Sequence, residues 1–207
     1  GDEARAILSD DRNLMLNYAI GSRATPGSIF KMVTGFGALD SGVLKPDEMI
    51  SDMGYYTAYN SDLSTAPKCW ISEGYRSQHY YQTIVNGLSN SCNYFFYEVG
   101  RLTGIRTLDS YASQFGLGQS TGIEIGDSSG VLASPEWSES HDQEWTDGQT
   151  ITAAIGQSYN LFTPLQLANY VATLVGGGDH YQAHLLKNVK AYDNSRLLYM
   201  YDDKPMN

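Results

Sequence analysis

The chain has 207 residues, of which 42% are hydrophobic, and its formal net charge is −10 at pH 7. This composition is sufficient for a hydrophobic core, and the excess of acidic side chains disfavours binding to nucleic acid or to an anionic lipid surface. We therefore expect a globular protein whose partners are neutral or cationic.

The sequence shows no membrane segment and no metal-binding pattern. No apolar run is long enough to cross a bilayer, and the N-terminal GDEARAILSDD lacks the features of a signal peptide, so we expect the chain as given to be soluble and without an anchor. Cys69 and Cys92 are too far apart for a Cys-x-x-Cys motif, and the four histidines have no close spacing. We expect no metal, no cofactor and two free thiols, with Cys92 packing as a small hydrophobic residue.

The first clear element is a helix in SIFKMVTGFGALDSG. Apolar residues from Ile29 to Leu39 recur at helical spacing, and the pattern stops at Gly42. Residues 43–76 are instead rich in turn formers and aromatic residues, which is typical of a long ordered loop with short strands. Loops of this length usually surround a site.

The remaining chain predicts four more helices and a few short strands. YYQTIVNGLSNSCNYFFYEVGRLTG predicts two helices with a break at residues 89–91, and IRTLDSYASQFGLG predicts a third. TGIEIGDSSGVLASPE has the glycine and serine content of turns around a short strand. TPLQLANYVATLVGGG begins with Thr163 as N-cap and Pro164 at the first helical position, and HLLKNVKAYDNSRLLYMYDD predicts one or two short strands.

A serine and a lysine stand three residues apart in ATPGSIFKMVTG, at the start of the first helix. Because positions i and i+3 share a helix face, Ser28 and Lys31 can come within hydrogen-bond reach. Burial among apolar neighbours would lower the lysine pKa, and the neutral amine could then accept the serine proton. Free backbone N–H groups at the helix start would stabilise negative charge on an attacked carbonyl.

The Ser-x-x-Lys pattern alone is weak evidence for this chemistry. Roughly one match is expected by chance in a chain of this length. In the alternative interpretation Ser28 is only an N-cap and the Lys31 side chain extends to solvent.

Four longer segments resemble the transpeptidase domain of class B penicillin-binding proteins. They are LMLNYAIGSRATPGSIFKMVTGFGALDSG, KCWISEGYRSQHYYQTIVNGLSNSCNYFFYEVGRLTG, YASQFGLGQSTGIEIGDSSG and AAIGQSYNLFTPLQLANYVATLVGGG, in the order and at about the distances found in that family. The resemblance covers nearly the whole chain. It implies a mainly α structure that corresponds to the helical lobe of the α+β fold shared by penicillin-binding proteins and serine β-lactamases.

The resemblance also implies roles for particular residues. Ser28 falls on the nucleophile and Lys31 on the base of the first motif. The second motif, Ser-x-Asn, falls on residues 91–93, where Ser91 would relay a proton between the lysine and the leaving amine and Asn93 would hold a substrate amide. Another Ser-x-Asn at residues 158–160 ranks lower, because it falls in the IGQ segment, and a turn before the last helix is its alternative interpretation.

The sequence departs from the family pattern in three places. Ile29 stands where threonine is common, and Tyr80 stands where glycine is common. None of the lysines at positions 31, 45, 68, 187, 190 and 204 precedes Thr-Gly or Ser-Gly, so the third motif, which closes the cleft and supplies half of the oxyanion hole, is absent. We therefore expect residues 1–207 to form a single, truncated transpeptidase domain with an incomplete or missing central sheet, which reacts poorly with penicillin and self-associates or is mobile around Ser28.

The resemblance implies that the parent protein is a serine DD-transpeptidase. It would cross-link peptidoglycan stem peptides ending in D-Ala-D-Ala at the extracytoplasmic face of a bacterial membrane, within a cell-wall synthesis complex, and β-lactams would acylate it. Two alternatives stay open: a non-catalytic lobe or β-lactam-sensing module, and a serine β-lactamase, for which the sequence offers no additional hydrolytic base.

Overall fold

A computed structural model describes residues 1–206 of the chain. Contacts divide the chain into two units. Residues 25–113 and 131–161 form one, called here the serine unit, and residues 1–24, 114–130 and 162–207 form the other, called the hairpin unit. The expectation of a single domain over residues 1–207 stays a prediction.

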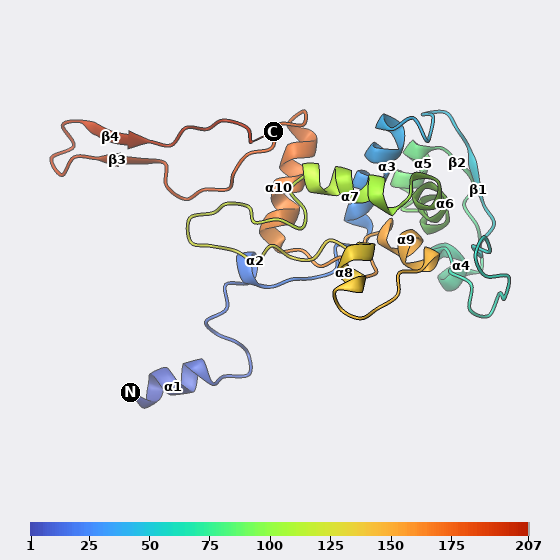
Figure 1. Cartoon of the computed structure of the whole chain (residues 1–207), viewed down its shortest axis with the longest axis horizontal. Helices are drawn as coiled ribbons and strands as arrows, with labels where there is room; N and C mark the ends of the chain where they lie inside the picture. Colours follow the sequence, from blue (N-terminus) through green and yellow to red (C-terminus); the bar gives the residue numbers. More distant parts are fainter. Residues whose placement is uncertain (207) are drawn as a thin grey trace. The chain divides into compact units, whose positions relative to one another are not determined.

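Helices dominate the serine unit, as the sequence predicted (Figure 1). Its elements are η1 (Gly27–Phe30), a 3₁₀ turn, α3 (Lys31–Asp40), β1 (Ile50–Asp52), α4 (Trp70–Tyr75), β2 (Tyr80–Gln82), α5 (Ile84–Ser89), α6 (Asn93–Thr103), α7 (Ile105–Gln114), α8 (Pro135–Glu139) and α9 (Asp147–Ala153). Strands β1 and β2 pair antiparallel, with Ile50 opposite Gln82 and Asp52 opposite Tyr80.

The core of the serine unit lies around α6, which packs against both α3 and α9. Its fully buried residues include Phe95, Phe96 and Val99 of α6 and Ile151 of α9. Gly100 permits the close approach of α6 to the end of α9, because a Cβ at this position would lie 2.3 Å from the Cβ of Ala154. Because α3 packs against α6, the N-terminal ends of these two helices are held in a fixed relation to each other.

The predicted helix at Ser28 is present, but its first turn is a 3₁₀ turn that continues into α3. Gly27 has φ +57° and donates its N–H to the carbonyl oxygen of Gly156 over 2.9 Å. Gly156 itself has φ +75°, and a Cβ there would lie 2.1 Å from the Gly27 oxygen. Only glycine fits at position 156, so the IGQ segment fixes the entry of the chain into the Ser28 turn.

The predicted break between two helices is also present. Helix α5 ends at Ser89, and α6 begins at Asn93. Between them Ser91 has φ +48°, an unusual conformation for a residue other than glycine. The Cys92 thiol caps α6 by accepting a hydrogen bond from the N–H of Phe95 over 3.4 Å.

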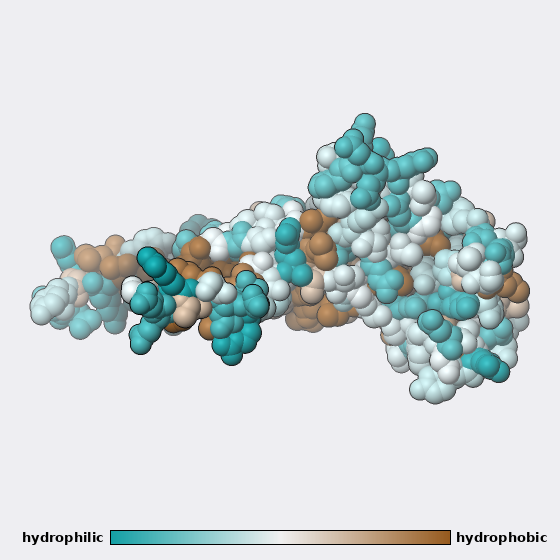
Figure 2. Space-filling model, turned by 90° about the horizontal axis from the view of Figure 1, so that it is seen from below, coloured by the Kyte–Doolittle hydropathy of each residue, from teal (hydrophilic) through white to brown (hydrophobic). Residues whose placement is uncertain are grey.

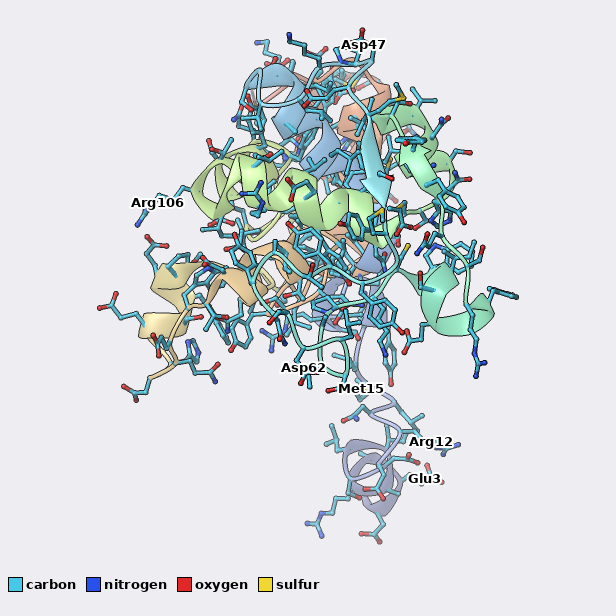
Figure 3. The ribbon with its side chains drawn as sticks, turned by 90° about the vertical axis from the view of Figure 1, so that its right-hand side faces the viewer. Glu3, Arg12, Met15, Asp47, Asp62 and Arg106 are labelled. Atoms are coloured by element: carbon cyan, nitrogen blue, oxygen red, sulfur yellow. The ribbon has the colours of Figure 1, made fainter. Side chains whose placement is uncertain are left out.

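The hairpin unit contains α1 (Asp2–Leu8), α2 (Tyr18–Gly21), α10 (Pro164–Val175), β3 (Asn188–Lys190) and β4 (Leu197–Met200). As predicted, Thr163 caps α10, accepting from the N–H of Gln166 while the Gln166 side chain accepts from the N–H of Thr163. Strands β3 and β4 form an antiparallel hairpin with exposed apolar side chains (Figure 2). No residue of α1 is buried, and Figure 3 shows Arg12 and Met15 on the segment that follows it.

Two expectations about local structure were wrong. The short strand expected within residues 121–136 is only an isolated bridge between Val131 and Leu161, because glycines with positive φ turn the chain repeatedly in this segment. The loop predicted at residues 43–76 contains strand β1, in agreement with the short strands expected there, but it also contains the short helix α4, which was not predicted.

Within the part of the chain that the structure describes, no helix has both the length and the apolar character that spanning a membrane would require.

Candidate active site

The Ser28 side chain is exposed in the 3₁₀ turn η1 and contacts a second serine. Its hydroxyl oxygen accepts a hydrogen bond from the Ser91 hydroxyl over 2.9 Å. Ser91 reaches this position because the left-handed turn between α5 and α6 projects its side chain toward η1. Two segments that are distant in sequence therefore bring two hydroxyl groups together.

Lys31 is the first residue of α3, and only 1% of its surface is exposed. Its ammonium group donates to the Ser91 carbonyl oxygen (2.8 Å), to Ser91 Oγ (3.1 Å) and to Asn93 Oδ1 (2.6 Å). Its Nζ also lies 5.6 Å from the centre of the Phe96 ring. The second motif thus supplies all three acceptors of the buried lysine.

Burial lowers the pKa of Lys31 to about 8. The cause is desolvation, which disfavours the charged form of an amine. A substantial fraction of this side chain is therefore neutral near physiological pH, as a general base requires.

The sequence predicted a direct contact between Ser28 and Lys31, and here the structure differs. Within residues 1–206 no hydrogen bond joins Ser28 Oγ to Lys31 Nζ; Ser91 Oγ lies between them instead. Because a hydroxyl both donates and accepts, the same three groups can reverse their hydrogen bonds when Lys31 is neutral. A proton can then move from Ser28 through Ser91 to the amine.

Asn93 is the first residue of α6 and its side chain is half-buried beside Lys31. Its Oδ1 accepts from the lysine, whereas its amide nitrogen has no hydrogen-bond partner among the described residues. The carboxamide therefore keeps two N–H donors that are not paired with a described residue.

Trp70 also holds the second motif, a role that the sequence analysis did not predict. Its indole N–H is shared between the carbonyl oxygens of Asn90 and Ser91, each at 3.1 Å. The Ser91 carbonyl thus accepts from both Trp70 and Lys31, which holds the left-handed turn in place. The Cys-Trp pair in the second matching segment drew attention to Trp70, but the sequence did not indicate that its indole N–H bonds to the second motif.

The competing Ser-x-Asn at residues 158–160 has a structural role. Asn160 is buried, accepts from the N–H of Ala133 (3.0 Å) and donates to the carbonyl of Ala153 (3.3 Å). The Ser158 hydroxyl is buried and has no hydrogen-bond partner in the part of the chain that the structure describes. The Asn160 carboxamide therefore joins two backbone segments.

Four side chains that could hold a metal ion lie close together, and one of them, Cys92, belongs to the second motif. The ligand atoms of Asp52, Cys69, His79 and Cys92 all lie within 4.8 Å of one another. The Asp52 carboxylate is 3.0 Å from His79 Nδ1 and 3.4 Å from Cys92 Sγ, and Cys69 Sγ is 3.4 Å from His79 Nδ1. The two sulfur atoms are 3.8 Å apart, so the predicted free thiols are confirmed.

This donor set fits a zinc-like ion. Two thiols, an imidazole and a carboxylate are typical ligands of a closed, four-coordinate structural site, and both cysteines are fully buried. Burial alone would raise the pKa of Asp52, but hydrogen bonds from Gly54, Cys69, His79 and Cys92 together lower it. The carboxylate is therefore ready to act as a ligand. An ion here would fix the loop of the second motif through Cys92.

The sequence predicted no metal, because these four residues do not have the spacing of a metal-binding motif. They come from β1, from the loop before α4, from the residue before β2 and from the break before α6, and only the fold brings them together.

The site therefore consists of an exposed serine, a second serine within hydrogen-bond distance of it, and a buried lysine that contacts the second serine. The chain also matches the family model of the penicillin binding protein transpeptidase domain over residues 3–207. The chain belongs to this family.

Two curated relatives illustrate the similarity. Peptidoglycan D,D-transpeptidase MrdA of Acinetobacter baumannii is 31% identical over 175 residues, covering 84% of this chain and 25% of the relative. Stage V sporulation protein D of Bacillus subtilis is 33% identical over 174 residues, covering 83% of this chain and 24% of the relative. The chain thus spans about a quarter of the length of either relative.

Solved structures show the same fold. The crystal structure of Pseudomonas aeruginosa PBP2 in complex with WCK 5153 has a TM-score of 0.82 and 28% identity, covering 99% of this chain and 45% of that chain. The complex between PBP2 and MreC from Helicobacter pylori gives a TM-score of 0.80 at 22% identity, covering 100% of this chain and 36% of that chain. The second likeness shows the fold alone.

Proposed function

We propose that this site performs the acyl-transfer chemistry of a peptidoglycan D,D-transpeptidase. The observation that carries the proposal is the position of the Ser91 hydroxyl, within hydrogen-bond distance of both Ser28 Oγ and Lys31 Nζ. The names of relatives such as MrdA support the same activity.

In the proposed mechanism Ser28 Oγ attacks the carbonyl carbon of the penultimate D-Ala of a stem peptide. Its proton passes through Ser91 to neutral Lys31, so a C–O bond forms as the amine becomes an ammonium group. Collapse of the tetrahedral intermediate breaks the peptide bond, and the leaving D-Ala nitrogen takes the proton back by the same route. The amine of a neighbouring strand then attacks the acyl-enzyme and gives up a proton to Lys31. A new peptide bond forms as the ester bond to Ser28 breaks, and this proton passes through Ser91 to Ser28 Oγ.

The proposed oxyanion hole has one donor in this chain. The backbone N–H of Ser28 would be the first donor, and the family pattern places the second on the strand of the Lys-Thr-Gly or Lys-Ser-Gly motif, which the 207 residues do not contain. We infer that the chain is the helical lobe of a single transpeptidase domain and that its central sheet is incomplete. On this basis its acylation is slow.

The proposed substrates are stem peptides that end in D-Ala-D-Ala, and the proposed inhibitors are β-lactams. The free amide N–H groups of Asn93 suit a peptide carbonyl, which supports a peptide substrate. We propose that the parent protein acts at the outer face of a bacterial membrane with other cell-wall proteins. A solved peptidoglycan synthase complex, whose matching chain is 29% identical to this one, supports such partners.

Acyl-enzyme mass spectrometry tests the proposal. A fluorescent penicillin should add to the wild-type chain at Ser28, slowly and stably, and should not add to Ser28→Ala. Rapid loss of the adduct by hydrolysis would favour the β-lactamase alternative. A stable adduct without transfer from a thioester donor to a D-amino acid, in a version that carries the third motif, would favour a β-lactam sensor.

A further inference from the structure

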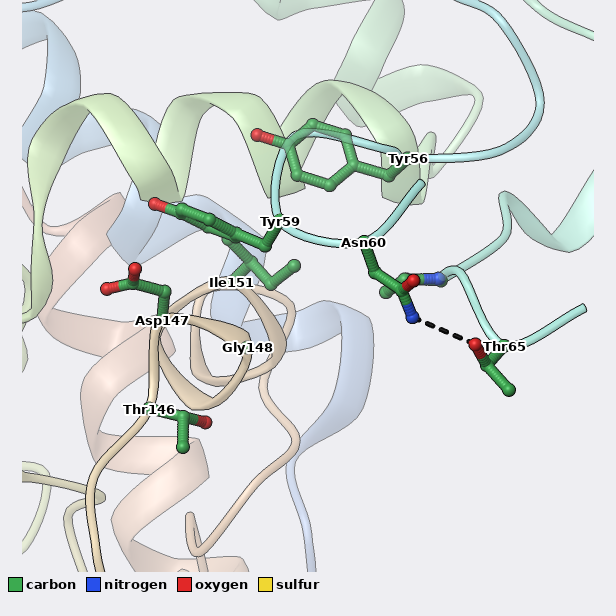
Figure 4. A pocket seen from close by; sticks show the side chains of 9 residues that line it. Tyr56, Tyr59, Asn60, Thr65, Thr146, Asp147, Gly148 and Ile151 are labelled. Carbon is green, nitrogen blue, oxygen red and sulfur yellow. Dashed lines mark hydrogen bonds between the residues drawn. The ribbon is translucent and has the colours of Figure 1, made fainter. Parts of the chain in front are cut away.

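A cavity separate from the Ser28 site lies in the serine unit, between the loop before α4 and the start of α9 (Figure 4). Its volume is about 450 Å³, within the range of small-molecule sites. It is lined by Tyr56, Tyr59, Asn60, Thr65, Pro67, Thr146, Asp147, Gly148 and Ile151. No lysine or arginine is among these residues, so an anionic ligand would find no counter-charge.

Most uncharged polar groups of the cavity are already engaged. Asn60 donates to Thr65 Oγ1 over 2.9 Å and accepts from the N–H of Asp62 over 2.9 Å. The Thr146 hydroxyl belongs to the capping box of α9 with Gln149. These groups have little capacity left for the many hydroxyls of a sugar.

The Asp147 carboxylate, by contrast, has no ion-pair or hydrogen-bond partner in residues 1–206. In Figure 4 it points toward the hydroxyl of Tyr59. The other nearby carboxylate, Glu98, is neutralised by Arg101, which binds it through two hydrogen bonds of 2.9 and 2.7 Å. One carboxylate without a paired cation, in the first turn of α9, therefore lines the cavity.

Aromatic and aliphatic groups surround this charge. Tyr56 is buried and held by its hydroxyl, which donates to Glu98 Oε2 over 2.6 Å, whereas Tyr59 is 45% exposed. Pro67 and Ile151 add aliphatic surface. Tyrosine rings attract cations through their electron-rich faces, and an aliphatic chain can pack against proline and isoleucine.

We propose that this cavity binds an alkylammonium group, with its charge at Asp147 and Tyr59 and its aliphatic stem against Pro67 and Ile151. A lysine-like side chain of a peptide and a free diamine both contain such an alkylammonium group. The proposal does not depend on the reaction at Ser28, and either can fail without the other.

The test is an NMR titration of the intact chain with two probes, 1,5-diaminopentane and Nα-acetyl-lysine amide. Both should shift the resonances of Tyr59 and Gly148. Diacetylated lysine amide, which has no charge, should not. Binding of the lysine probe alone would identify a peptide side chain as the ligand. Equal binding of both probes would show that the cavity recognises only the alkylammonium group.

Matched variants decide whether Asp147 is responsible. Asp147→Asn should weaken binding about fivefold, as expected for loss of one exposed ion pair, while Asp142→Asn, an exposed acid outside the cavity, should not. Tyr59→Phe should retain binding and Tyr59→Leu should weaken it. An unchanged melting temperature of the Asp147 variant ensures that the fold is intact. Absence of binding by either amine, equal binding of the diacetylated probe, or an Asp147→Asn variant that binds like wild type would overturn the proposal.

Discussion

The Ser91 hydroxyl donates a hydrogen bond to the Ser28 hydroxyl over 2.9 Å, although 63 residues separate them in the sequence. Lys31 donates a hydrogen bond to Ser91 Oγ and none to Ser28, so in the proposed mechanism proton transfer between Ser28 and Lys31 depends on this one hydroxyl.

Replacing Ser91 with alanine should therefore reduce the rate of penicillin acylation by roughly 10²- to 10⁴-fold, the usual contribution of general acid–base catalysis. The matched control is Ser158→Ala, in the other Ser-x-Asn, where the hydroxyl is buried and unpartnered. The control should keep its acylation rate. Similar losses in both variants would mean that Ser91 has no special role.

The pH dependence of acylation should follow Lys31. With a pKa of about 8, the fraction of neutral amine rises about tenfold per pH unit below pH 8 and levels off above it. The acylation rate should do the same, and Lys45→Met, at an exposed lysine, should leave the profile unchanged. A flat profile between pH 6 and pH 9 would exclude Lys31 as the base.

The lowered pKa of Lys31 also makes the free energy of unfolding depend on pH within a defined range. The usual value is 10.5, so between about pH 8 and pH 10.5 the unfolded chain holds this proton while the folded chain does not. The Lys31 contribution to the free energy of unfolding therefore rises with pH across that window, because burying the charged amine is costly below it.

The sequence predicted those parts of the candidate site that depend on the positions where helices begin and end. The Ser28 turn, the break at Ser91 and the cap at Thr163 follow from helix periodicity and capping, and all three are present. The indole bond of Trp70 and the Asp147 cavity could not be predicted, because they depend on how irregular loops fold back on the helices. No spacing rule describes such contacts.

The cluster of Asp52, Cys69, His79 and Cys92 predicts a response to zinc. Equimolar Zn²⁺ should raise the melting temperature, a strong chelator should reverse this, and Mg²⁺ should have no effect, because the donors are thiols and an imidazole. In Cys69→Ser the effect of zinc should be much smaller. A melting temperature that responds to neither zinc nor the chelator would show that these residues form only a hydrogen-bonded cluster.

Substitutions at Tyr80 test whether the backbone beside this cluster is strained. Tyr80 has φ +54° and is 60% exposed, at a position where the family pattern commonly has glycine. Tyr80→Gly and Tyr80→Ala both remove the ring, but only glycine relieves the left-handed conformation. Chemical denaturation should show the glycine variant more stable than the alanine variant by about 1 kcal/mol. The reverse order would mean that φ is not strained here.

The most direct test of the account is the second-order rate constant for acylation of Ser28, compared between this chain and a version that also carries a Lys-Thr-Gly or Lys-Ser-Gly strand. We expect both proteins to be labelled only at Ser28, with the longer version faster by at least about 10²-fold because it supplies the second oxyanion donor. Equal rates, or labelling that survives Ser28→Ala, would contradict the account.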